Sequence, residues 1–181
     1  HKIFFSYLHR SKVRKYYMIN SSILTREISE KDNVQIAELI RRVIVEFGAP
    51  KVGTAYEDKA LDNLFLHYQK ERSAYFVLVE VDRIIGAAGI APLQEGPNHI
   101  CELQKMYFLP EARGRGFGAK LIQQCLNKAK EMGFKSCYIE TMPNMIAAQK
   151  LYRRNGFEYI DKAMGNTGHH SCSVWLLNES I

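Results

Sequence analysis

The chain has 181 residues, of which 46% are hydrophobic and 24% are charged. This length fits one domain that buries roughly 70% of its unfolded surface, and the composition is that of a globular rather than a disordered protein. No apolar run approaches the roughly 18 residues of a membrane-spanning helix. Coiled-coil, collagen-like and repeat architectures are excluded on composition and pattern.

The formal net charge is +6 and the sequence pI is about 9.1, which raises the question of a nucleic-acid or membrane partner. Five of these positive charges lie in residues 1–17, which contain no acidic residue. Residues 18–181 have 20 basic and 19 acidic side chains, a net charge of +1. We therefore expect neither nucleic acid nor a membrane as partner.

Residues 1–17 form a basic, aromatic leader ahead of the first methionine, Met18. Three interpretations stay open: an extension foreign to the native protein, a short amphipathic helix that packs on the domain or a partner, or a membrane-surface or transit segment. Ile3 and Tyr7, four residues apart, are compatible with the helix. We expect the functional domain to span 18–181 and its activity to survive loss of the leader.

The cysteines show no CxxC pair and no spacing typical of a disulfide framework. Reduced thiols in a cytoplasmic protein are the expectation. They are Cys101, Cys125, Cys137 and Cys172.

The first part of the domain combines a β-prone segment with two helices. Residues 23–28 are expected to form a strand. Apolar residues with a period of 3.6 predict a helix over 36–47, and Gly48 can end it. A second helix is predicted over 61–68 from the same pattern.

Strands dominate the middle of the chain. Residues 74–81 and 84–91 are predicted strands joined at Asp82-Arg83 as an antiparallel hairpin. A third strand is predicted over 100–109.

The last part alternates helices and strands. Two helices and three strands are predicted, with the helices carrying apolar stripes of period 3.6. Their ranges are 117–132 (helix), 137–141 (strand), 145–154 (helix), 157–161 (strand) and 173–177 (strand). The whole pattern predicts an α/β (α+β) domain with a mixed sheet.

Residues 113–119 have the sequence RGRGFGA and lie between a predicted strand and the longest predicted helix. Glycines let backbone N–H groups approach a phosphate, and the following helix directs its positive end into the same space. Arg113 and Arg115 add positive charge that a pyrophosphate would attract. A site for a small anion is therefore expected here, with a solvated turn as the alternative.

A dinucleotide-binding site is a second interpretation of this loop. Gly114, Gly116 and Ala119 match GxGxxA, and Glu140 follows about 20 residues later, where a ribose-binding acid would lie. Against it, residues 109–113 separate the strand from the glycines, and the preceding strands form an antiparallel meander. We therefore disfavour the dinucleotide fold.

The motif Arg113-x-x-Gly116-x-Gly118 resembles the Q/R-x-x-G-x-G/A signature of the GNAT superfamily of acyl-CoA-dependent N-acetyltransferases. Residues 103–110 resemble the family's fourth strand, and residues 145–157 are similar to its N-x-x-A-x-x-L-Y-x-x-x-G-F segment. The resemblance spans about residues 23–177. One departure is Met145, which stands where the family often has Asn.

The resemblance implies a single GNAT-type domain with six to seven mostly antiparallel strands, in which the fourth and fifth strands splay around an acetyl-CoA slot. It implies transfer of an acetyl group from acetyl-CoA to a primary amine by direct attack in a ternary complex, without a metal. Backbone N–H groups of the fourth strand would orient the thioester. The implied cosubstrate contacts are Met106, Tyr107, Phe108, Arg113, Gly114, Arg115, Gly116, Phe117, Gly118, Ala119 and Tyr152.

Two proton transfers complete the implied chemistry. Tyr152 matches the family's tyrosine and would protonate the departing thiolate. Glu102 is the first candidate for the base that deprotonates the amine, directly or through water, and Glu140 is the second. His169, in the loop before the last strand, is a further candidate for the base or for a substrate contact.

Other functions stay open at this point. The acceptor could be a small-molecule or a peptide amine, and a homodimer is compatible with the sequence. A catalytically silent CoA-binding sensor would carry the same loop. A nucleic-acid-binding protein that depends on the leader is a third, less favoured class.

Overall fold

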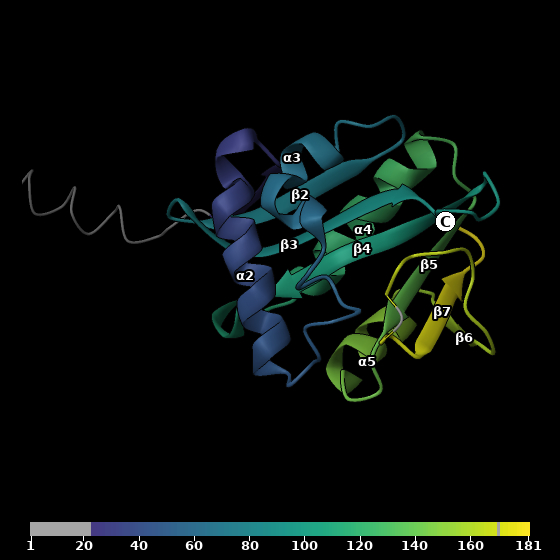
Figure 1. The fold of residues 1–181 in the computed structure, drawn as a ribbon. Helices are drawn as coiled ribbons and strands as arrows, with labels where there is room; N and C mark the ends of the chain where they lie inside the picture. The colour runs from purple at the N-terminus through teal and green to yellow at the C-terminus, as the bar shows by residue number, and fades with distance from the viewer. Residues whose placement is uncertain (1–22, 170) are drawn as a thin grey trace, which may run out of the picture.

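The structure is a computed structural model that describes residues 23–169 and 171–181 (Figure 1). The leader at 1–17 lies outside the described residues. A seven-stranded sheet has the order β1-β2-β3-β4-β5-β7-β6. Its strands are β1 (Ile23–Glu27), β2 (Ala74–Glu80), β3 (Arg83–Pro92), β4 (Ile100–Phe108), β5 (Ser136–Thr141), β6 (Glu158–Ile160) and β7 (Val174–Asn178).

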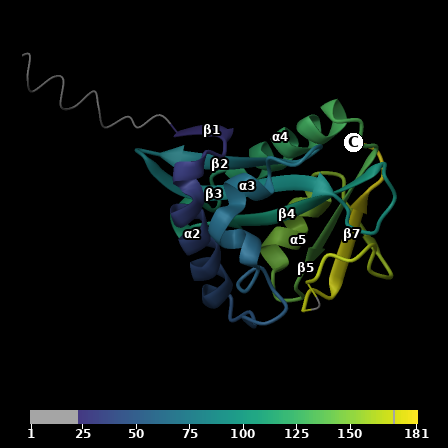
Figure 2. The ribbon, with the colours of Figure 1, turned by 45° about the horizontal axis from the view of Figure 1, so that its top comes forward.

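Helices cover both faces of this sheet (Figures 1 and 2). One core packs the α2 and α3 side against β2 and β3, and a second core packs α4 and α5 against the opposite face. The α-helices are α2 (Asn33–Glu46), α3 (Leu64–His67), α4 (Phe117–Glu131) and α5 (Ile146–Arg154), and the 3-10 turns are η1 (Glu30–Asp32), η2 (Lys59–Asn63) and η3 (Pro110–Ala112). The predicted α/β architecture with a mixed sheet is confirmed.

The hairpin between β2 and β3 turns one residue earlier than predicted. Val81 and Asp82 both have positive φ, 48° and 62°, as the two central residues of a type I′ turn require. The residues that follow in β3 are buried almost throughout, so the strand has no alternation of apolar and polar residues from which the register could be read.

The helix predicted over 61–68 is divided into η2 and the single turn of α3. Asn63 accepts a hydrogen bond from the N–H of Leu66 at 3.4 Å and so caps α3. Asp58 caps η2 in the same way, through the N–H of Ala60 at 2.9 Å. Side chains of this kind compete with continuous helix by binding the backbone locally, which the apolar spacing does not reveal.

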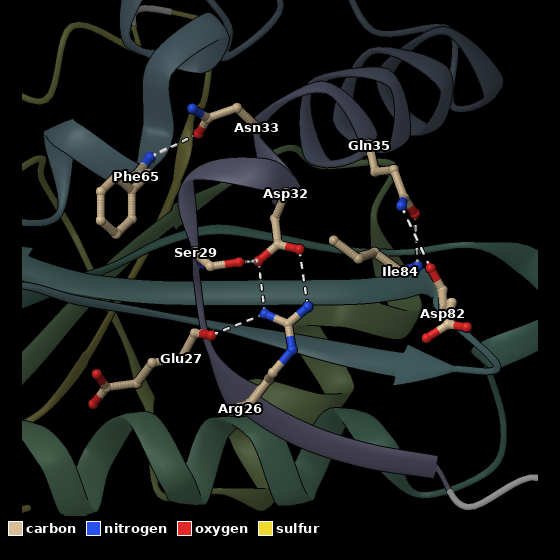
Figure 3. Close-up of polar contacts among 9 residues, drawn as sticks. All are labelled: Arg26, Glu27, Ser29, Asp32, Asn33, Gln35, Phe65, Asp82 and Ile84. Atoms are coloured by element: carbon tan, nitrogen blue, oxygen red, sulfur yellow. Dashed lines mark hydrogen bonds and ion pairs between the residues drawn. The ribbon is translucent and has the colours of Figure 1, made fainter.

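The junction between β1 and α2 is fixed by the buried carboxylate of Asp32 (Figure 3). Asp32 accepts two hydrogen bonds from the Arg26 guanidinium, at 2.6 and 2.9 Å, and two from Ser29, through its N–H and its hydroxyl, each at 2.7 Å. Burial opposes ionisation, but these hydrogen bonds prevail and lower the pKa of Asp32 to about 2. The carboxylate therefore joins the edge strand to the start of the helix.

The centre of the sheet is interrupted between β4 and β5. These parallel strands pair only at Ile100–Ser136, Cys101–Cys137 and Glu102–Tyr138, and they diverge beyond Glu102. β4 also carries a bulge: Gln104 pairs with Gly89 and Tyr107 with Ala87, so two residues of β4 lie opposite one of β3. The divergence and the bulge lie side by side and shape the candidate site.

Candidate active site

The diverging ends of β4 and β5 open a pocket in the middle of the sheet. β4 lines it from Glu102 to Tyr107, and β5 contributes Glu140. Tyr152 of α5, the loop before β7, and the end of α2 with the loop that follows it (Ile44, Thr54) also line it. The pocket thus brings together the three residues that the sequence singled out for catalysis, although they are up to 50 positions apart in the chain.

Glu102 lies at the apex of the pocket, where β4 and β5 part. The residue is only 2% exposed. Burial raises the pKa of its carboxyl to about 7, against the opposing effects of a hydrogen bond from Gln104 and the charge of Lys105. Glu102 therefore titrates near neutral pH, as a general acid or base at a reacting centre requires.

A chain of hydrogen bonds orients the Glu102 carboxyl. Gln104 donates from Nε2 to Oε2 of Glu102 at 2.7 Å, and the hydroxyl of Tyr68 donates to Oε1 of Gln104 at 2.8 Å. Tyr68 is itself buried and packs on Tyr75, with ring centroids 4.7 Å apart. The chain thus connects Glu102 to the core beneath α3, and neither Gln104 nor Tyr68 was predicted as part of the site.

Glu140 lies on β5 across the pocket, and both of its oxygens accept hydrogen bonds. The hydroxyl of Tyr138 donates at 2.6 Å and that of Thr167 at 2.7 Å. Thr167 belongs to the loop before β7, and its hydroxyl also accepts the N–H of His169 at 3.2 Å. Glu140 thus holds this loop over the pocket, and His169 lines the pocket from the same loop.

Two tyrosines that line the pocket, Tyr107 and Tyr152, keep their protons at neutral pH. Tyr152 is 5% exposed, and burial raises the pKa of its phenol well above the usual value near 10. Burial has the same effect on the pKa of Tyr107. Each phenol can therefore donate a hydrogen bond or a proton to a negative charge that forms in the pocket.

Lys105 occupies the bulge of β4 with φ of 47° and was not singled out from the sequence. Its side chain is 4% exposed, and its ammonium forms an ion pair with Asp58 at 2.7 Å. A buried lysine is rare in proteins. Only the bulge in β4 would have identified Lys105 as a pocket residue. The bulge arises from the pairing of β4 with β3, so the local sequence does not reveal it.

Cys172 also lines the pocket. Burial, followed by the charges of Glu140 and Glu102, raises the pKa of its thiol to about 11, so it stays protonated. Within residues 23–169 and 171–181, no three His, Cys, Asp or Glu side chains gather as a metal site would require. Over the same residues, no helix is long and apolar enough to cross a membrane.

The glycine loop leads into the N-terminus of α4. Gly114 and Gly116 have φ of 71° and 79°, and a Cβ added at either would meet nothing within 4 Å. Both positions thus need the left-handed conformation and leave open space beside the backbone. The first N–H groups of α4 have no partner within the helix and are free to bind an anion there.

Gly118 also has a packing role, which its place in the motif does not suggest. A Cβ at this position would lie 2.6 Å from Cδ2 of Leu151, so the missing side chain lets α4 and α5 approach closely. Because Leu151 directly precedes Tyr152, this contact also sets where the tyrosine enters the pocket. Gly118 thus has a packing role beside the cosubstrate contact that the resemblance implies.

The two loop arginines are already paired with carboxylates. Arg113 forms a bidentate ion pair with Glu46 of α2, at 2.5 and 2.9 Å, and donates to the carbonyl of Phe108 at 2.9 Å. Arg115 lies 3.3 Å from Glu80 of β2. Their charges are compensated, so an anion at the loop would depend mainly on backbone N–H groups and the helix end.

The side chains of the fourth-strand segment pack in the core. Met106 packs with the α4 side and Tyr107 with the α2 side, and the ring of Phe108 fills the space that Gly86 leaves by lacking a Cβ. For Phe108, any contribution to binding would come from the backbone, whereas Met106 and Tyr107 also line the pocket. Asn144 directly precedes Met145, the residue that differs from the family motif. Its side chain donates to the carbonyl of Phe47 at 3.1 Å and thus links the start of α5 to the end of α2.

The comparisons with known proteins agree with this geometry. A model of the acetyltransferase (GNAT) family matches residues 40–157. The uncharacterized N-acetyltransferase YjgM of Escherichia coli is 43% identical over 159 residues, which cover 87% of this chain and 95% of that protein.

Solved structures share the fold. A GNAT acetyltransferase from Staphylococcus aureus superposes with a TM-score of 0.76 at 21% identity, over 87% of this chain and 98% of that one. A phosphinothricin acetyltransferase from Sinorhizobium meliloti, in complex with acetyl-CoA, has a TM-score of 0.70 at 18% identity, over 87% and 88%. The family match and the relative over nearly its whole length show that this chain belongs to the GNAT family of acetyltransferases.

Proposed function

We propose that this protein transfers the acetyl group of acetyl-CoA to a primary amine by direct attack within a ternary complex, with Glu102 as the general base. The observation that carries this proposal is the buried Glu102 carboxyl at the apex of the slot, whose pKa lies at about 7. An alkylammonium has no lone pair until it loses a proton, and a base with a pKa near the working pH accepts that proton most effectively.

The donor side of the slot suits acetyl-CoA as cosubstrate. The open glycine loop and the N-terminus of α4 provide backbone N–H groups for its pyrophosphate. The gap between β4 and β5 accommodates the pantetheine arm beside the backbone of Met106 to Phe108. Proteins of the same fold from Sinorhizobium meliloti and Salmonella typhimurium were solved with acetyl-CoA, which supports acetyl-CoA as the cosubstrate.

The reaction then needs two protein groups. Glu102 takes a proton from the acceptor ammonium, and the freed nitrogen attacks the thioester carbonyl carbon. The carbon–sulfur bond breaks as the amide forms, and the phenol of Tyr152 gives its proton to the departing thiolate. The second proton, which the nitrogen loses on becoming an amide, restores the phenol, and Glu102 releases the first proton to solvent. Burial raises the pKa of Tyr152, so the phenol still carries its proton when the thiolate forms.

Glu140 is the alternative base, and the hydrogen bonds favour Glu102. Both oxygens of Glu140 already accept from Tyr138 and Thr167. Among the described residues, Glu102 accepts one hydrogen bond, at Oε2, which leaves Oε1 for the acceptor or a bridging water. We assign Glu140 the electrostatic attraction of the acceptor ammonium and the anchoring of the loop above it.

The first experiment separates an enzyme from a silent CoA-binding sensor. Acetyl-CoA is mixed with a panel of primary amines, small-molecule and peptide, and free CoA thiol is measured in the steady state. An enzyme releases thiol in proportion to the acceptor. Binding of acetyl-CoA by calorimetry without thiol release from any amine would instead support the sensor.

The pH–rate profile then tests the base. We expect kcat/KM to rise with pH through about pH 7, because Glu102 acts only when it is deprotonated. Glu102→Gln should lower kcat/KM roughly 100-fold and remove this acidic limb. Glu140→Gln is the matched variant and should keep the limb; if it loses the limb while Glu102→Gln keeps it, Glu140 is the base.

A further inference from the structure

The strained position of Lys105 calls for an explanation beyond the reaction. A residue other than glycine with φ of 47° is uncommon, and such residues concentrate at functional sites. The bulge is fixed from the core, because the buried hydroxyl of Tyr75 donates to the carbonyl of Lys105 at 2.8 Å. The fold thus holds a lysine side chain, 4% exposed, in the lining of the pocket.

The ammonium of Lys105 has more donors than the protein uses. Asp58 accepts from it at 2.7 Å and is its one ion-pair partner within the described part of the chain. The other oxygen of Asp58 accepts the N–H of Ala60, which fixes the carboxylate at the start of η2. A lysine ammonium carries three N–H donors. Within the described residues, two of them are therefore left for an acceptor oxygen in the pocket, and a buried donor without a partner is costly.

Lys105 and Glu102 face the same pocket from one strand, three residues apart. Their charges interact, since Lys105 opposes the rise of the Glu102 pKa that burial causes. The positively charged ammonium of Lys105 thus lies near the carboxyl of Glu102, which we propose to accept a proton from the acceptor amine. An acceptor with a negative group close to its amine would match both.

We infer that Lys105 is a specificity-determining residue that binds a carboxylate of the acceptor, and that the acceptor class is therefore amino acids rather than simple alkylamines. This inference rests on the proposed function. The ammonium end of the amino acid lies toward Glu102 and its carboxylate toward Lys105. The two contacts orient the nitrogen, whereas an amine without a carboxylate leaves the Lys105 donors unused.

The test compares acceptors that differ only in the carboxylate. Leucine is paired with isoamylamine and phenylalanine with phenethylamine, and kcat/KM is measured for each by thiol release. A charge-assisted hydrogen bond corresponds to a preference of roughly 10- to 100-fold for the amino acid. Lys105→Met should reduce this ratio to about 1, and calorimetry with CoA present should show the same loss in amino-acid binding.

Controls separate specificity from folding. The double variant Lys105→Met/Asp58→Asn avoids leaving a carboxylate unpaired and should show the same loss of preference. Lys59→Met, an exposed lysine outside the pocket lining, should keep the wild-type ratio. Acetyl-CoA binding by each variant shows that the donor site is intact.

The outcomes are distinct. If no acceptor of either kind gives thiol, the proposed function fails. If the wild type uses both kinds equally, or if Lys105→Met keeps the preference, only the present inference is overturned. It is also overturned if Lys105→Met weakens acetyl-CoA binding and leaves the acceptor ratio unchanged, because Lys105 would then serve the cosubstrate.

Discussion

Burial of Glu102, which we propose as the general base, destabilises the fold when its carboxyl is ionised. Its carboxyl has a folded-state pKa of about 7, above the ordinary value of 4.5. The folded state therefore binds this proton more tightly than the unfolded state. The protonated carboxyl thus stabilises the folded state relative to the unfolded state. This contribution is fully present below about pH 4 and is lost as the pH rises through about 7.

Glu102→Gln should therefore stabilise the protein at alkaline pH while it impairs catalysis. A neutral side chain of the same shape avoids burying a charge, and we expect the free energy of unfolding at pH 8 to rise by about 3 kcal/mol. Near pH 4 the variant and the wild type should be equally stable. Urea unfolding at both pH values measures the difference, and a gain that does not depend on pH would contradict the raised pKa.

Gln104 is expected to tune the base through its hydrogen bond to Glu102. That bond lowers the pKa of Glu102, so Gln104→Leu should move the acidic limb of kcat/KM to higher pH. Below the limb, activity should fall roughly tenfold. Tyr68→Phe, which leaves Gln104 without its 2.8 Å partner, should move the limb in the same direction. The exposed Gln123→Leu is the control, and a limb that stays in place in both site variants would refute the positioning role.

Some residues of the site could be predicted because a local sequence pattern marks them, and others could not because the tertiary structure places them. Glu102, Glu140 and Tyr152 lie at positions that a motif or a strand end marks, and the structure brings all three to one pocket. Lys105 and Tyr68 are there because of a bulge and a divided helix. The bulge depends on the pairing of β4 with β3, whose partners on either side of it lie 15 and 20 residues apart in the sequence. The division of the helix depends on the caps by Asp58 and Asn63, which the apolar spacing does not reveal.

The glycines of the loop before α4 are needed for different reasons, Gly116 for its positive φ and Gly118 for its close contact with Leu151. Gly116→Ala introduces a side chain at φ of 79° without any clash, so we expect a stability loss of about 1 kcal/mol from backbone strain alone. Because the loop must then shift, acetyl-CoA should bind roughly tenfold more weakly. Calorimetric titration measures the affinity, and an unchanged Kd would remove the loop from the binding site.

Gly118→Ala should act through helix packing instead. The new methyl would lie 2.6 Å from Cδ2 of Leu151, so either this side chain must change conformation or α4 and α5 must move apart, and overpacking should cost about 1 kcal/mol. The double variant Gly118→Ala/Leu151→Ala provides the missing space and should recover part of this loss. Thermal unfolding of the single and the double variant measures this recovery of stability. If the double variant is no more stable than Gly118→Ala, the contact between Gly118 and Leu151 does not limit the packing.

The β1–α2 junction depends on the ionised form of Asp32. Its pKa of about 2 lies below the ordinary 3.8, so its stabilisation is present above about pH 4 and is lost as the pH falls to 2. Asp32→Asn should lower the free energy of unfolding by about 2 kcal/mol at pH 7. At pH 2 the difference should vanish, which urea unfolding can measure; Asp62→Asn, at a carboxylate with an exposed side chain, is the control.

Element boundaries were predicted well where a stop signal is local and less well where it is not. α4 begins and ends within one residue of its prediction, because glycines lie at both ends. The β2–β3 turn shifted by one residue, because Val81 is an unusual residue for positive φ and only the pairing of the two strands places it there.

On the scale of the whole molecule, the candidate slot divides the sheet. β1 to β4 form one half and β5, β7 and β6 the other, and the halves are joined by three residue pairs between β4 and β5. The packing of α4 and α5 on the shared face spans the seam, since one core contains residues of β3, β4, β5 and both helices. A continuous core of this kind makes a domain unfold as one unit.

The single tryptophan, Trp175, makes this continuity measurable because it lies on β7, in the smaller half. We expect urea unfolding followed by Trp175 fluorescence and by far-UV circular dichroism to superimpose, since the shared core couples the two halves. Acetyl-CoA, which would bind both halves across the slot, should shift the two curves together, by about 2.7 kcal/mol at a concentration 100-fold above its Kd. An earlier fluorescence transition that acetyl-CoA abolishes would mean instead that the halves separate independently and that the ligand itself supplies the coupling.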